Sequence, residues 1–397
     1  KCFNGEGEKM RKQNNVQKTV SDIIAKVRSG GDRALFFFEK KYGSISLNEK
    51  NLRFVKKDFD EALKKLPADT RKGLETAAKN IFFYQKKIRA LYKDVKVKRP
   101  GLTLTHRFRA LSKTAVYVPG GRYFYPSTVL MNAIPAKVAG VSEIYAASCG
   151  VSDEVLAACA LSGVKSLFRI SGAQAIASFA MGTESVPKVD FIAGPGNKYV
   201  TEAKRQLFGE TGIDLLAGPS EVLVLADGSV PEEWVLADLA AQLEHAPDAR
   251  ASLITPSKKL LNFITAVFGG KVKAFLIKDK KKQIEKADEI APEHLIVMMK
   301  NSAGYEGNFK NAGAVFLGKY SPVALGDYAA GPSHTLPTGK SAVFSSGLNA
   351  GSFLRSYAEI KYEKKGFESD SDFAAIIAGA EGMANHKKSI EIRKVRI

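Results

Sequence analysis

Four of the five histidines in this 397-residue chain stand near a carboxylate or carboxamide side chain. The pairs are Gln242 with His245, Glu293 with His294, Asp327 with His334, and Glu381 with His386. Imidazole and carboxylate groups together can hold a divalent metal ion or exchange protons with a substrate. The four pairs taken together therefore predict a metal site and an acid–base pair in the second half of the chain. The fifth histidine, His106, is expected at the surface of a hairpin.

Each pair taken alone has a plainer explanation. Gln242 and His245 lie three residues apart on a predicted helix that ends at 246–247, so they share one helix face. Glutamine is an uncommon zinc ligand, and an amphipathic helix end is the more typical interpretation of such a pair. Glu381 and His386 are five residues apart across a glycine and are expected on different sides of one contact. Acids beside histidines are also frequent at solvated helix caps.

The two remaining pairs are predicted outside helices. Asp327 and His334 lie seven residues apart in the segment "GDYAAGPSH", which suits a loop that aims both side chains into a cleft. Glu293 and His294 are adjacent at a predicted strand entry, where successive side chains point to opposite faces of the pleat. We expect these two side chains to diverge.

The elements that must position these residues follow an α/β pattern. Short apolar runs from "AVYVP" (115–119) to "GAVFLG" (313–318) alternate with helix-like stretches of roughly 10 to 15 residues, as parallel β-α-β units do. The region before them is predicted to be helical, with a break at 29–31 and a long amphipathic helix over 69–93. A β-hairpin is predicted over 95–108, turning at Pro100-Gly101.

Glycine- and proline-rich turns follow several of the predicted strands. They are "VPGG" (118–121), "SGAQ" (171–174), "GPGN" (194–197) and "GPSE" (218–221). At the carboxyl ends of parallel strands such turns let the backbone approach a nucleotide phosphate, although they can equally be simple tight turns. No G-x-G-x-x-G fingerprint is present, so a dinucleotide would bind atypically.

Composition narrows the class of protein. The three cysteines lack C-x-x-C spacing, no apolar run reaches the ~18 residues of a membrane span, and the first residues lack the apolar core of a signal peptide. We therefore expect a cytoplasmic protein without a membrane partner. The net charge of +19 raises the alternative of a non-enzymatic nucleic-acid-binding protein. The basic clusters at 64–73 and 278–289 mix acids with bases, as solvated helix faces do, so we expect no nucleic-acid partner.

Long motifs in order along the chain resemble those of the histidinol dehydrogenase family, from about residue 14 to the C-terminus. They include "VPGGRYFYPSTVLMNAIPAKVAGV", "DFIAGPGNKYVTEAKRQLFG", "GIDLLAGPSEVLVLAD", "AAQLEHAPDA", "APEHL", "GDYAAGPSHTLPT" and "AEGMANH". Position by position, the resemblance implies that Gln242, His245, Asp327 and His386 hold one zinc ion and surround the substrate. It implies further substrate contacts by Ser220, His334 and Glu381, a catalytic pair of Glu293 and His294, and NAD contacts by Tyr117, Gln174 and Asn197.

The activity that the resemblance implies is a zinc-dependent, four-electron oxidation of L-histidinol to L-histidine through L-histidinal, reducing two NAD, in the last steps of histidine biosynthesis. In this scheme a neutral His294 takes the hydroxyl proton and Glu293 activates the water that hydrates the aldehyde. The family is a homodimer in which the C-terminal segment reaches the neighbour's active site. A zinc dehydrogenase of another small amino-alcohol or diol is the alternative within the superfamily.

The expected architecture is α/β, with two incomplete Rossmann-like parallel-sheet domains, a small helical N-terminal extension and a small C-terminal segment. The expected boundaries are residues 1–13 for the extension, 14–116 with 222–348 for the first domain, 117–221 for the second domain and 349–397 for the dimerisation segment.

Overall fold

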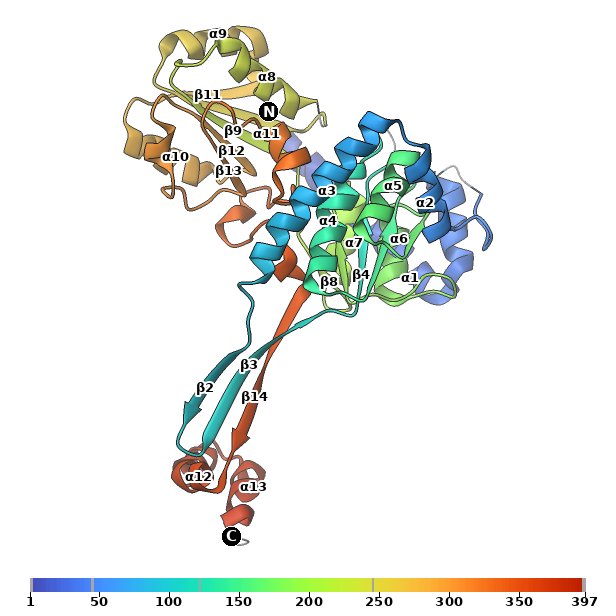
Figure 1. The fold of residues 1–397 in the computed structure, drawn as a ribbon, viewed down its shortest axis with the longest axis vertical. Helices are drawn as coiled ribbons and strands as arrows, with labels where there is room; N and C mark the ends of the chain where they lie inside the picture. Colours follow the sequence, from blue (N-terminus) through green and yellow to red (C-terminus); the bar gives the residue numbers. More distant parts are fainter. Residues whose placement is uncertain (1–2, 44–45, 121–122, 245, 395–397) are drawn as a thin grey trace. The chain divides into compact units, whose positions relative to one another are not determined.

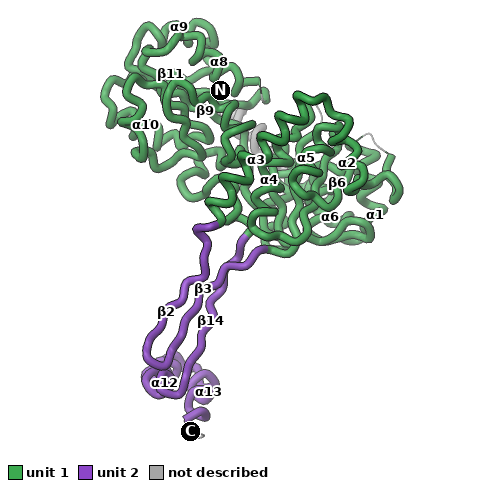
Figure 2. Tube along the Cα trace, in the orientation of Figure 1, with its two compact units in different colours: residues 1–89, 111–353 green, residues 90–110, 354–397 purple. Residues whose placement is uncertain are grey.

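The computed structural model describes the backbone of residues 3–43, 46–120, 123–244 and 246–394, and the side chains of these residues from 15 onward. The chain forms two compact units, residues 1–89 with 111–353 and residues 90–110 with 354–397 (Figure 2). None of the helices in the described ranges combines the length and the apolar character needed to cross a membrane.

The first unit contains a six-stranded sheet in the order β1-β6-β5-β4-β7-β8. Its strands are β1 (Arg53–Val55), β4 (Lys113–Tyr117), β5 (Glu143–Ala147), β6 (Ser166–Phe168), β7 (Phe191–Ala193) and β8 (Gly212–Ile213). The strands pair in parallel except for β1, which runs antiparallel to β6. The predicted parallel β-α-β pattern is thus confirmed for this part of the chain.

One group of helices, α1 (Phe3–Phe38), α6 (Gly172–Met181) and α7 (Lys198–Leu207), packs on the first sheet. α1 packs on α6 and α7, and their apolar side chains share a buried cluster with the sheet. Within α1, Gly31 has a φ of 48° and a ψ of −134°, so the helix breaks there, as predicted.

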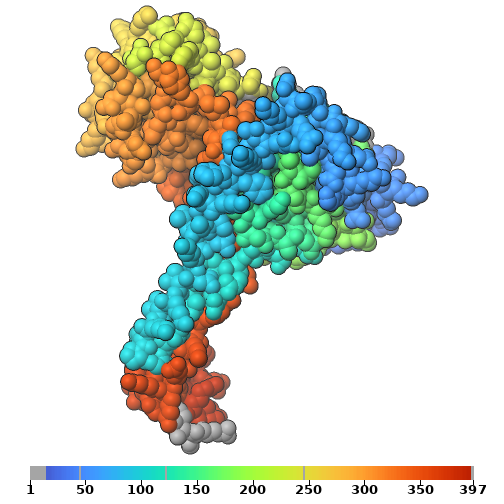
Figure 3. All heavy atoms as spheres, in the orientation of Figure 1, coloured from blue at the N-terminus to red at the C-terminus, as the bar shows by residue number. Residues whose placement is uncertain are grey.

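A second group of helices packs together around α4. α4 (Pro126–Ala139) contacts α3 (Ala68–Arg89) and α5 (Asp153–Ser162), and α5 also contacts α2 (Lys56–Lys65) (Figure 1). α3 is the predicted amphipathic helix, and it runs along the surface of the first unit, blue in Figure 3.

The second sheet of the first unit is entirely parallel, in the order β11-β10-β9-β12-β13. Its strands are β9 (Glu221–Ala226), β10 (Arg250–Thr255), β11 (Val272–Leu276), β12 (His294–Met298) and β13 (Ala314–Leu317). Its helices are α8 (Glu232–Leu243), α9 (Lys258–Phe268) and α10 (Lys280–Ile290). Alternate residues of β9 belong to two separate apolar clusters, so this strand is buried on both faces, as its continuous apolar run requires.

Short segments complete the first unit. They are the π-helical turns η1 (Glu39–Gly43) and η4 (Gly326–Ala330), the 3₁₀ turns η2 (Gly269–Lys271), η3 (Ser302–Tyr305), η5 (Ser341–Val343) and η6 (Ala350–Phe353), and the single turn α11 (Val323–Leu325).

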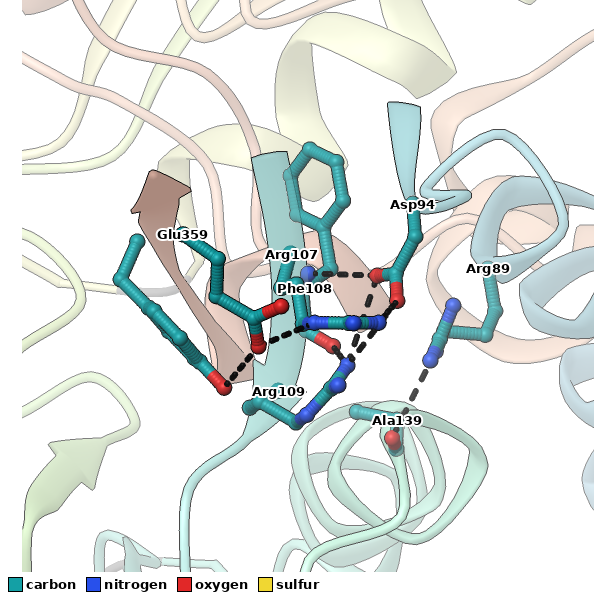
Figure 4. A network of polar contacts seen from close by, with 8 residues as sticks. Arg89, Asp94, Arg107, Phe108, Arg109, Ala139 and Glu359 are labelled. Carbon is teal, nitrogen blue, oxygen red and sulfur yellow. Dashed lines mark hydrogen bonds and ion pairs between the residues drawn. The ribbon is translucent and has the colours of Figure 1, made fainter. Parts of the chain in front are cut away.

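The second unit is a three-stranded antiparallel sheet, β14-β3-β2, with two helices. Its elements are β2 (Val95–Arg99), β3 (Leu102–Ala110), β14 (Leu354–Tyr362), α12 (Lys364–Ala380) and α13 (Ala384–Lys394). The predicted hairpin is therefore confirmed as β2 and β3. Arg107 donates to Asp94 at 2.9 Å and Arg109 donates to it at 3.4 Å, and Arg107 also contacts Glu359 of β14 (Figure 4). His106 is exposed on β3, as expected.

The sheets divide the chain differently from the expected domain boundaries. β1 and β4 were expected in one domain with residues 222–348, yet both belong to the sheet that continues through β8. The sequence pattern does not distinguish the two groupings, because a short strand looks alike whichever sheet it joins. The structure also extends β14 and the two C-terminal helices into a unit with residues 90–110 rather than leaving 349–397 alone.

A buried ion pair holds the carboxyl end of β7. Lys204 and Asp214, whose side chains are 3% and 2% exposed, lie 2.6 Å apart. Lys204 Nζ donates to the Gly194 carbonyl at 2.5 Å, and the Gly194 N–H donates to Asp214 at 2.7 Å. Gly194 has a φ of 110°, and a Cβ there would lie 2.1 Å from the Tyr117 carbonyl oxygen, so only glycine fits against β4.

We expect Lys204→Met to lower the free energy of unfolding by on the order of 3 to 5 kcal/mol, because it leaves the Asp214 charge buried and unpaired. K204M/D214N should recover part of that loss, since it removes the orphaned charge and keeps an acceptor for Gly194. Urea unfolding measures both, with the exposed Lys281→Met as a control that should change stability by less than about 0.5 kcal/mol. Equal stabilities of K204M and K281M would contradict the assignment.

Candidate active site

Two titratable residues are held on the backbone of one strand residue. The Glu293 carboxylate accepts a hydrogen bond from the Glu221 N–H at 2.9 Å, and His294 Nδ1 lies 3.3 Å from the Glu221 carbonyl oxygen. Glu293 and His294 are each 6% exposed. The position follows from the register of the second sheet, in which His294, the first residue of β12, pairs with Val222 of β9.

The two side chains do not diverge as expected. His294 Nδ1 lies 3.6 Å from a Glu293 carboxylate oxygen. The pleat rule applies within a strand, but β12 begins at His294, and Glu293 lies in the preceding turn, where Ala291 has a φ of 49°. That turn brings the two groups to the same side.

Burial changes the proton affinity of Glu293. The pKa of Glu293 is raised to about 8, mainly by removal from water and in part by the nearby Asp327 and Glu221 charges, while the hydrogen bond from the Glu221 N–H opposes the shift. A carboxyl with a pKa near neutrality can exchange protons with a substrate at physiological pH.

A third acid approaches from the loop after β13. Asp327 Oδ1, on η4, lies 3.8 Å from His294 Nε2, and burial raises the pKa of Asp327 to about 7. His334 follows in the same loop, with Nδ1 3.2 Å from the Asp327 carbonyl oxygen and Nε2 3.4 Å from Thr128 Oγ1 of α4. Of these two loop residues, Asp327 therefore lies beside His294 of the Glu293–His294 pair.

The end of α8 lies beside this loop. Glu244, the C-terminal cap of α8, and Tyr328 line the same cavity of about 940 Å³, which also adjoins Tyr123 and Phe124. α8 ends at Leu243 and not at 246–247 as predicted, and His245 lies outside the described residues. The expected shared helix face of Gln242 and His245 therefore stays a prediction.

The donor set can be tested against a metal. Gln242 is 4% exposed, and its amide nitrogen has no hydrogen-bond partner among the described residues. A buried amide N–H group without an acceptor is costly, and a bound substrate could supply one, whereas a zinc ion would be held by the amide oxygen. Asp327 supplies a carboxylate in the neighbouring loop. The described residues contain no cluster of three or more His, Cys, Asp or Glu side chains that could hold a metal by themselves. Gln242 and Asp327 thus fit part of a zinc site that needs further ligands.

Ser220 immediately precedes β9, and two hydrogen bonds tie its neighbourhood to the loop of His334. The Gly218 N–H donates to Thr338 Oγ1 at 2.6 Å, and the Gly339 N–H donates to the Glu221 carboxylate at 3.3 Å. The turn 218–221 therefore leads into β9 at the amino edge of the second sheet and differs from the turns at strand carboxyl ends.

The three predicted cofactor residues lie at the carboxyl edge of the first sheet. Tyr117 ends β4 and accepts a hydrogen bond from the Gly172 N–H at 3.1 Å, and burial raises its pKa to about 12. Gln174, in the first turn of α6, is 2% exposed. Asn197 is exposed and caps α7, where its side chain accepts from the N–H groups of the first helical turn.

Glu381 and His386 belong to the second unit. Glu381 caps the end of α12, Gly382 follows with a φ of 73°, and His386 lies on α13. Both side chains are exposed within that unit. Their expected placement on different sides of one contact stays a prediction.

Comparison with known proteins decides the family. A family model described as histidinol dehydrogenase matches residues 7–394. The chain is 39% identical over 398 residues to the histidinol dehydrogenase of Methanocaldococcus jannaschii, covering 95% of this chain and 92% of that protein. It is 39% identical to that of Aquifex aeolicus, with the same coverage. The crystal structure of histidinol dehydrogenase from Elizabethkingia anophelis superposes with a TM-score of 0.89 at 30% identity, covering 96% of this chain and 92% of that one.

The chain belongs to the histidinol dehydrogenase family. It is therefore an oxidoreductase, and the resemblance and the fold class inferred from its motifs are confirmed.

The motifs did not predict the structural roles of two polar residues in this histidinol dehydrogenase family member. Glu221 holds Glu293 and His294 through its backbone N–H and C=O groups. Every residue type other than proline carries both groups, so the sequence does not indicate this role. Glu39 is fully buried against Gln174, although it stands in an ordinary helical segment of the sequence. An acid within the apolar run "ALFFFEKKY" was the one available signal.

The raised pKa of Glu293 predicts how stability depends on pH in the metal-free protein. Between its ordinary value of 4.5 and about 8 the folded state binds more protons at Glu293 than the unfolded chain does, so this residue lowers stability as pH rises through that window. Glu293→Gln should remove that part of the loss, on the order of 5 kcal/mol at about 1.4 kcal/mol per pKa unit.

Urea unfolding after chelation, repeated from about pH 5 to about pH 8.5, measures the effect. The exposed Glu285→Gln is the control and should keep the wild-type slope. If E293Q also kept that slope, Glu293 would not carry the raised pKa.

Proposed function

We propose that this chain oxidises L-histidinol to L-histidine through L-histidinal, with one zinc ion per subunit and two NAD per turnover, in the last steps of histidine biosynthesis. The observation that carries the proposal is the buried pair of Glu293 and His294, held on the Glu221 backbone beside Asp327 in a chain of this family.

His294 serves as the base for the alcohol. An Nδ1–H that donates to the Glu221 carbonyl, 3.3 Å away, selects the tautomer whose Nε2 carries the lone pair. Nε2 is then able to take the hydroxyl proton of the substrate as the hydride leaves carbon. The same backbone contact fixes the ring plane, so the proton acceptor is oriented before the substrate arrives.

Glu293 serves the second oxidation. The aldehyde must be hydrated before a second hydride can leave, and an ionised carboxylate can draw a proton from the attacking water. A pKa of about 8 makes Glu293 a stronger base than an ordinary carboxylate while leaving part of it ionised near neutral pH. The Glu221 N–H holds the carboxylate in one orientation for that transfer.

In this proposal the substrate is held by residues of the second sheet and its loops, together with residues from the C-terminal helices of a partner subunit. Ser220, His334 and Glu381 contact the substrate in this proposal, together with the groups Gln242, His245, Asp327 and His386 that would hold zinc. Zinc held by these residues would supply coordination for the substrate and so help to orient its alcohol. The burial of Gln242, whose amide oxygen would be the ligand atom, supports this assignment.

Tyr117, Gln174 and Asn197 contact NAD, which accepts one hydride in each oxidation. Their common place at the carboxyl edge of the first sheet supports the assignment, because ligands of open parallel sheets bind at that edge. The absence of a G-x-G-x-x-G sequence agrees with an incomplete Rossmann-like fold.

The active enzyme in this proposal is a cytoplasmic homodimer in which Glu381 and His386 serve the partner's site. Their unit exposes apolar side chains of α12, including Phe373 at 52% and Ile376 at 70%, which an interface would cover. We propose no nucleic-acid or membrane partner.

The first test counts NADH formed per L-histidinol consumed. We expect a ratio near two, because each of the two oxidations reduces one NAD, and we expect activity to fall on chelation and return with zinc. Glu293→Gln should lower the ratio toward about one, since the first oxidation needs only His294 as base, whereas His294→Asn should lower both oxidations by roughly 100-fold or more.

A wild-type ratio near one would contradict the four-electron reaction. Absence of NADH formation from histidinol, with activity on another amino-alcohol or diol, would favour the alternative dehydrogenase within the superfamily. Unchanged activity after chelation would contradict the zinc assignment.

The second test asks whether the active site is shared. H294N and H386A should each be nearly inactive as homodimers, but chains unfolded together and refolded at equal amounts should regain about a quarter of wild-type activity, because half of the dimers then carry one intact site. If His386 serves its own subunit, no mixed dimer has an intact site and the mixture stays inactive. Refolded wild-type chains give the reference activity.

A further inference from the structure

Glu39 is a fully buried carboxyl in a part of the fold that the proposed chemistry does not use. It begins η1, between α1 and β1, and is 0% exposed. Glutamate is almost never fully buried without a charged partner. Within the described residues no lysine, arginine or histidine forms an ion pair with it. Its environment must therefore satisfy the carboxyl by hydrogen bonds alone.

Those hydrogen bonds all come from the start of α6. Glu39 Oε1 accepts from the Ser171 N–H at 2.8 Å and from Gln174 Nε2 at 2.8 Å, and Oε2 accepts from Ser171 Oγ at 3.3 Å. Burial raises the pKa of Glu39, and the hydrogen bonds from Ser171 and Gln174 oppose that rise. The carboxyl thus binds the N-terminal cap residue of α6 and a side chain of its first turn.

The chain leaves room for this carboxyl at Gly43. A Cβ built at Gly43 would lie 2.6 Å from Glu39 Oε2, nearer than real Cβ contacts come. Gly43 does not have a positive φ, so its backbone conformation does not demand glycine. Space for the Glu39 carboxyl is the remaining physical reason for a residue without a side chain there.

The contact determines how the Gln174 amide is turned. An ionised carboxylate only accepts hydrogen bonds, so the amide nitrogen of Gln174 must face Glu39 and the amide oxygen must face away. Across the part of the chain that the structure describes, no hydrogen bond engages that oxygen. It lies beside Gly172, where a Cβ would be 3.0 Å from it, and the Gly172 N–H donates to Tyr117. Gln174 and Tyr117 therefore meet around the backbone of Gly172.

We propose that Glu39 is a positioning residue of the cofactor site, which turns the Gln174 carboxamide so that its oxygen accepts a hydrogen bond from a donor group of the dinucleotide. The donor would be a ribose hydroxyl or an amide or amino N–H, because these are the donors that a nicotinamide dinucleotide carries. The inference rests on the proposed function, which assigns Gln174 to NAD.

The test uses Glu39→Gln in the full-length enzyme. The introduced glutamine side chain has the same shape but both donates and accepts, so it no longer obliges the Gln174 nitrogen to face it. We expect KM for NAD to rise about tenfold, which corresponds to one lost hydrogen bond, while kcat at saturating NAD stays within about twofold. NAD titration by calorimetry should show the same loss of affinity.

Gln174→Ala tests whether Glu39 acts through Gln174. Q174A alone should raise KM for NAD, and E39Q/Q174A should raise it little further, since the residue that Glu39 orients is already gone. Gly43→Ala is a second variant, because its methyl group displaces the Glu39 carboxyl, and it should raise KM for NAD in the same direction. The matched control is Glu184→Gln, whose carboxylate accepts the Asp32 N–H at 2.7 Å without contacting Gln174 and whose KM should stay at the wild-type value.

The outcomes separate the two levels of inference. Wild-type protein that reduces no NAD with histidinol would overturn the proposed function itself. With an active wild type, an unchanged KM in E39Q, or additive effects of E39Q and Q174A, would overturn the role of Glu39 and leave the histidinol oxidation intact. A matching rise in E184Q would also overturn it, because the effect would then be a general loss of structure.

Discussion

The backbone N–H and C=O groups of one residue, Glu221, position the candidate catalytic pair of Glu293 and His294. Its N–H binds the Glu293 carboxylate and its C=O lies against the His294 ring, and both side chains are nearly excluded from water. Such burial raises the proton affinity of a carboxyl, so the geometry and the basicity have one cause. Because β9 and β12 are adjacent parallel strands, their register decides where the two groups stand.

The second sheet is built to keep that register. β9 lies between β10 and β12 and is buried on both faces, so a shift of one residue would move apolar side chains out of both clusters. The loop after β13 is held to the start of β9 by hydrogen bonds at Gly218 and Gly339. The loop carries Asp327 and His334, so the strand and the loop that supply the candidate site are tied to each other.

The first sheet uses buried polar contacts in a similar way. Lys204 donates to the carbonyl of Gly194 and Asp214 accepts from its N–H, while Glu39 accepts from the N–H of Ser171 at the start of α6. Each contact fixes a turn at the carboxyl edge, where backbone approach to a dinucleotide requires little side-chain bulk. Without these hydrogen bonds and ion pairs the buried charged groups would destabilise the fold. They lie beside the predicted NAD residues, which indicates that they help to fix the positions of those residues.

Local sequence determined much of this protein. The apolar runs from 115–119 to 313–318 form strands. The break at Gly31 and the hairpin over 95–108 lie where glycine, proline and the alternation of residues predicted them. The long motifs identified the family. These features depend on residues that are neighbours in the chain. Tertiary structure alone decided which sheet β1 and β4 join, because a short strand offers the same pattern to either sheet. It also brought Glu293 and His294 to one side of the turn before β12, ended α8 at Leu243 and buried Glu39 against Gln174. Those outcomes depend on backbone groups and side chains that lie far apart in the sequence, and no local pattern of residue types encodes the distance between them.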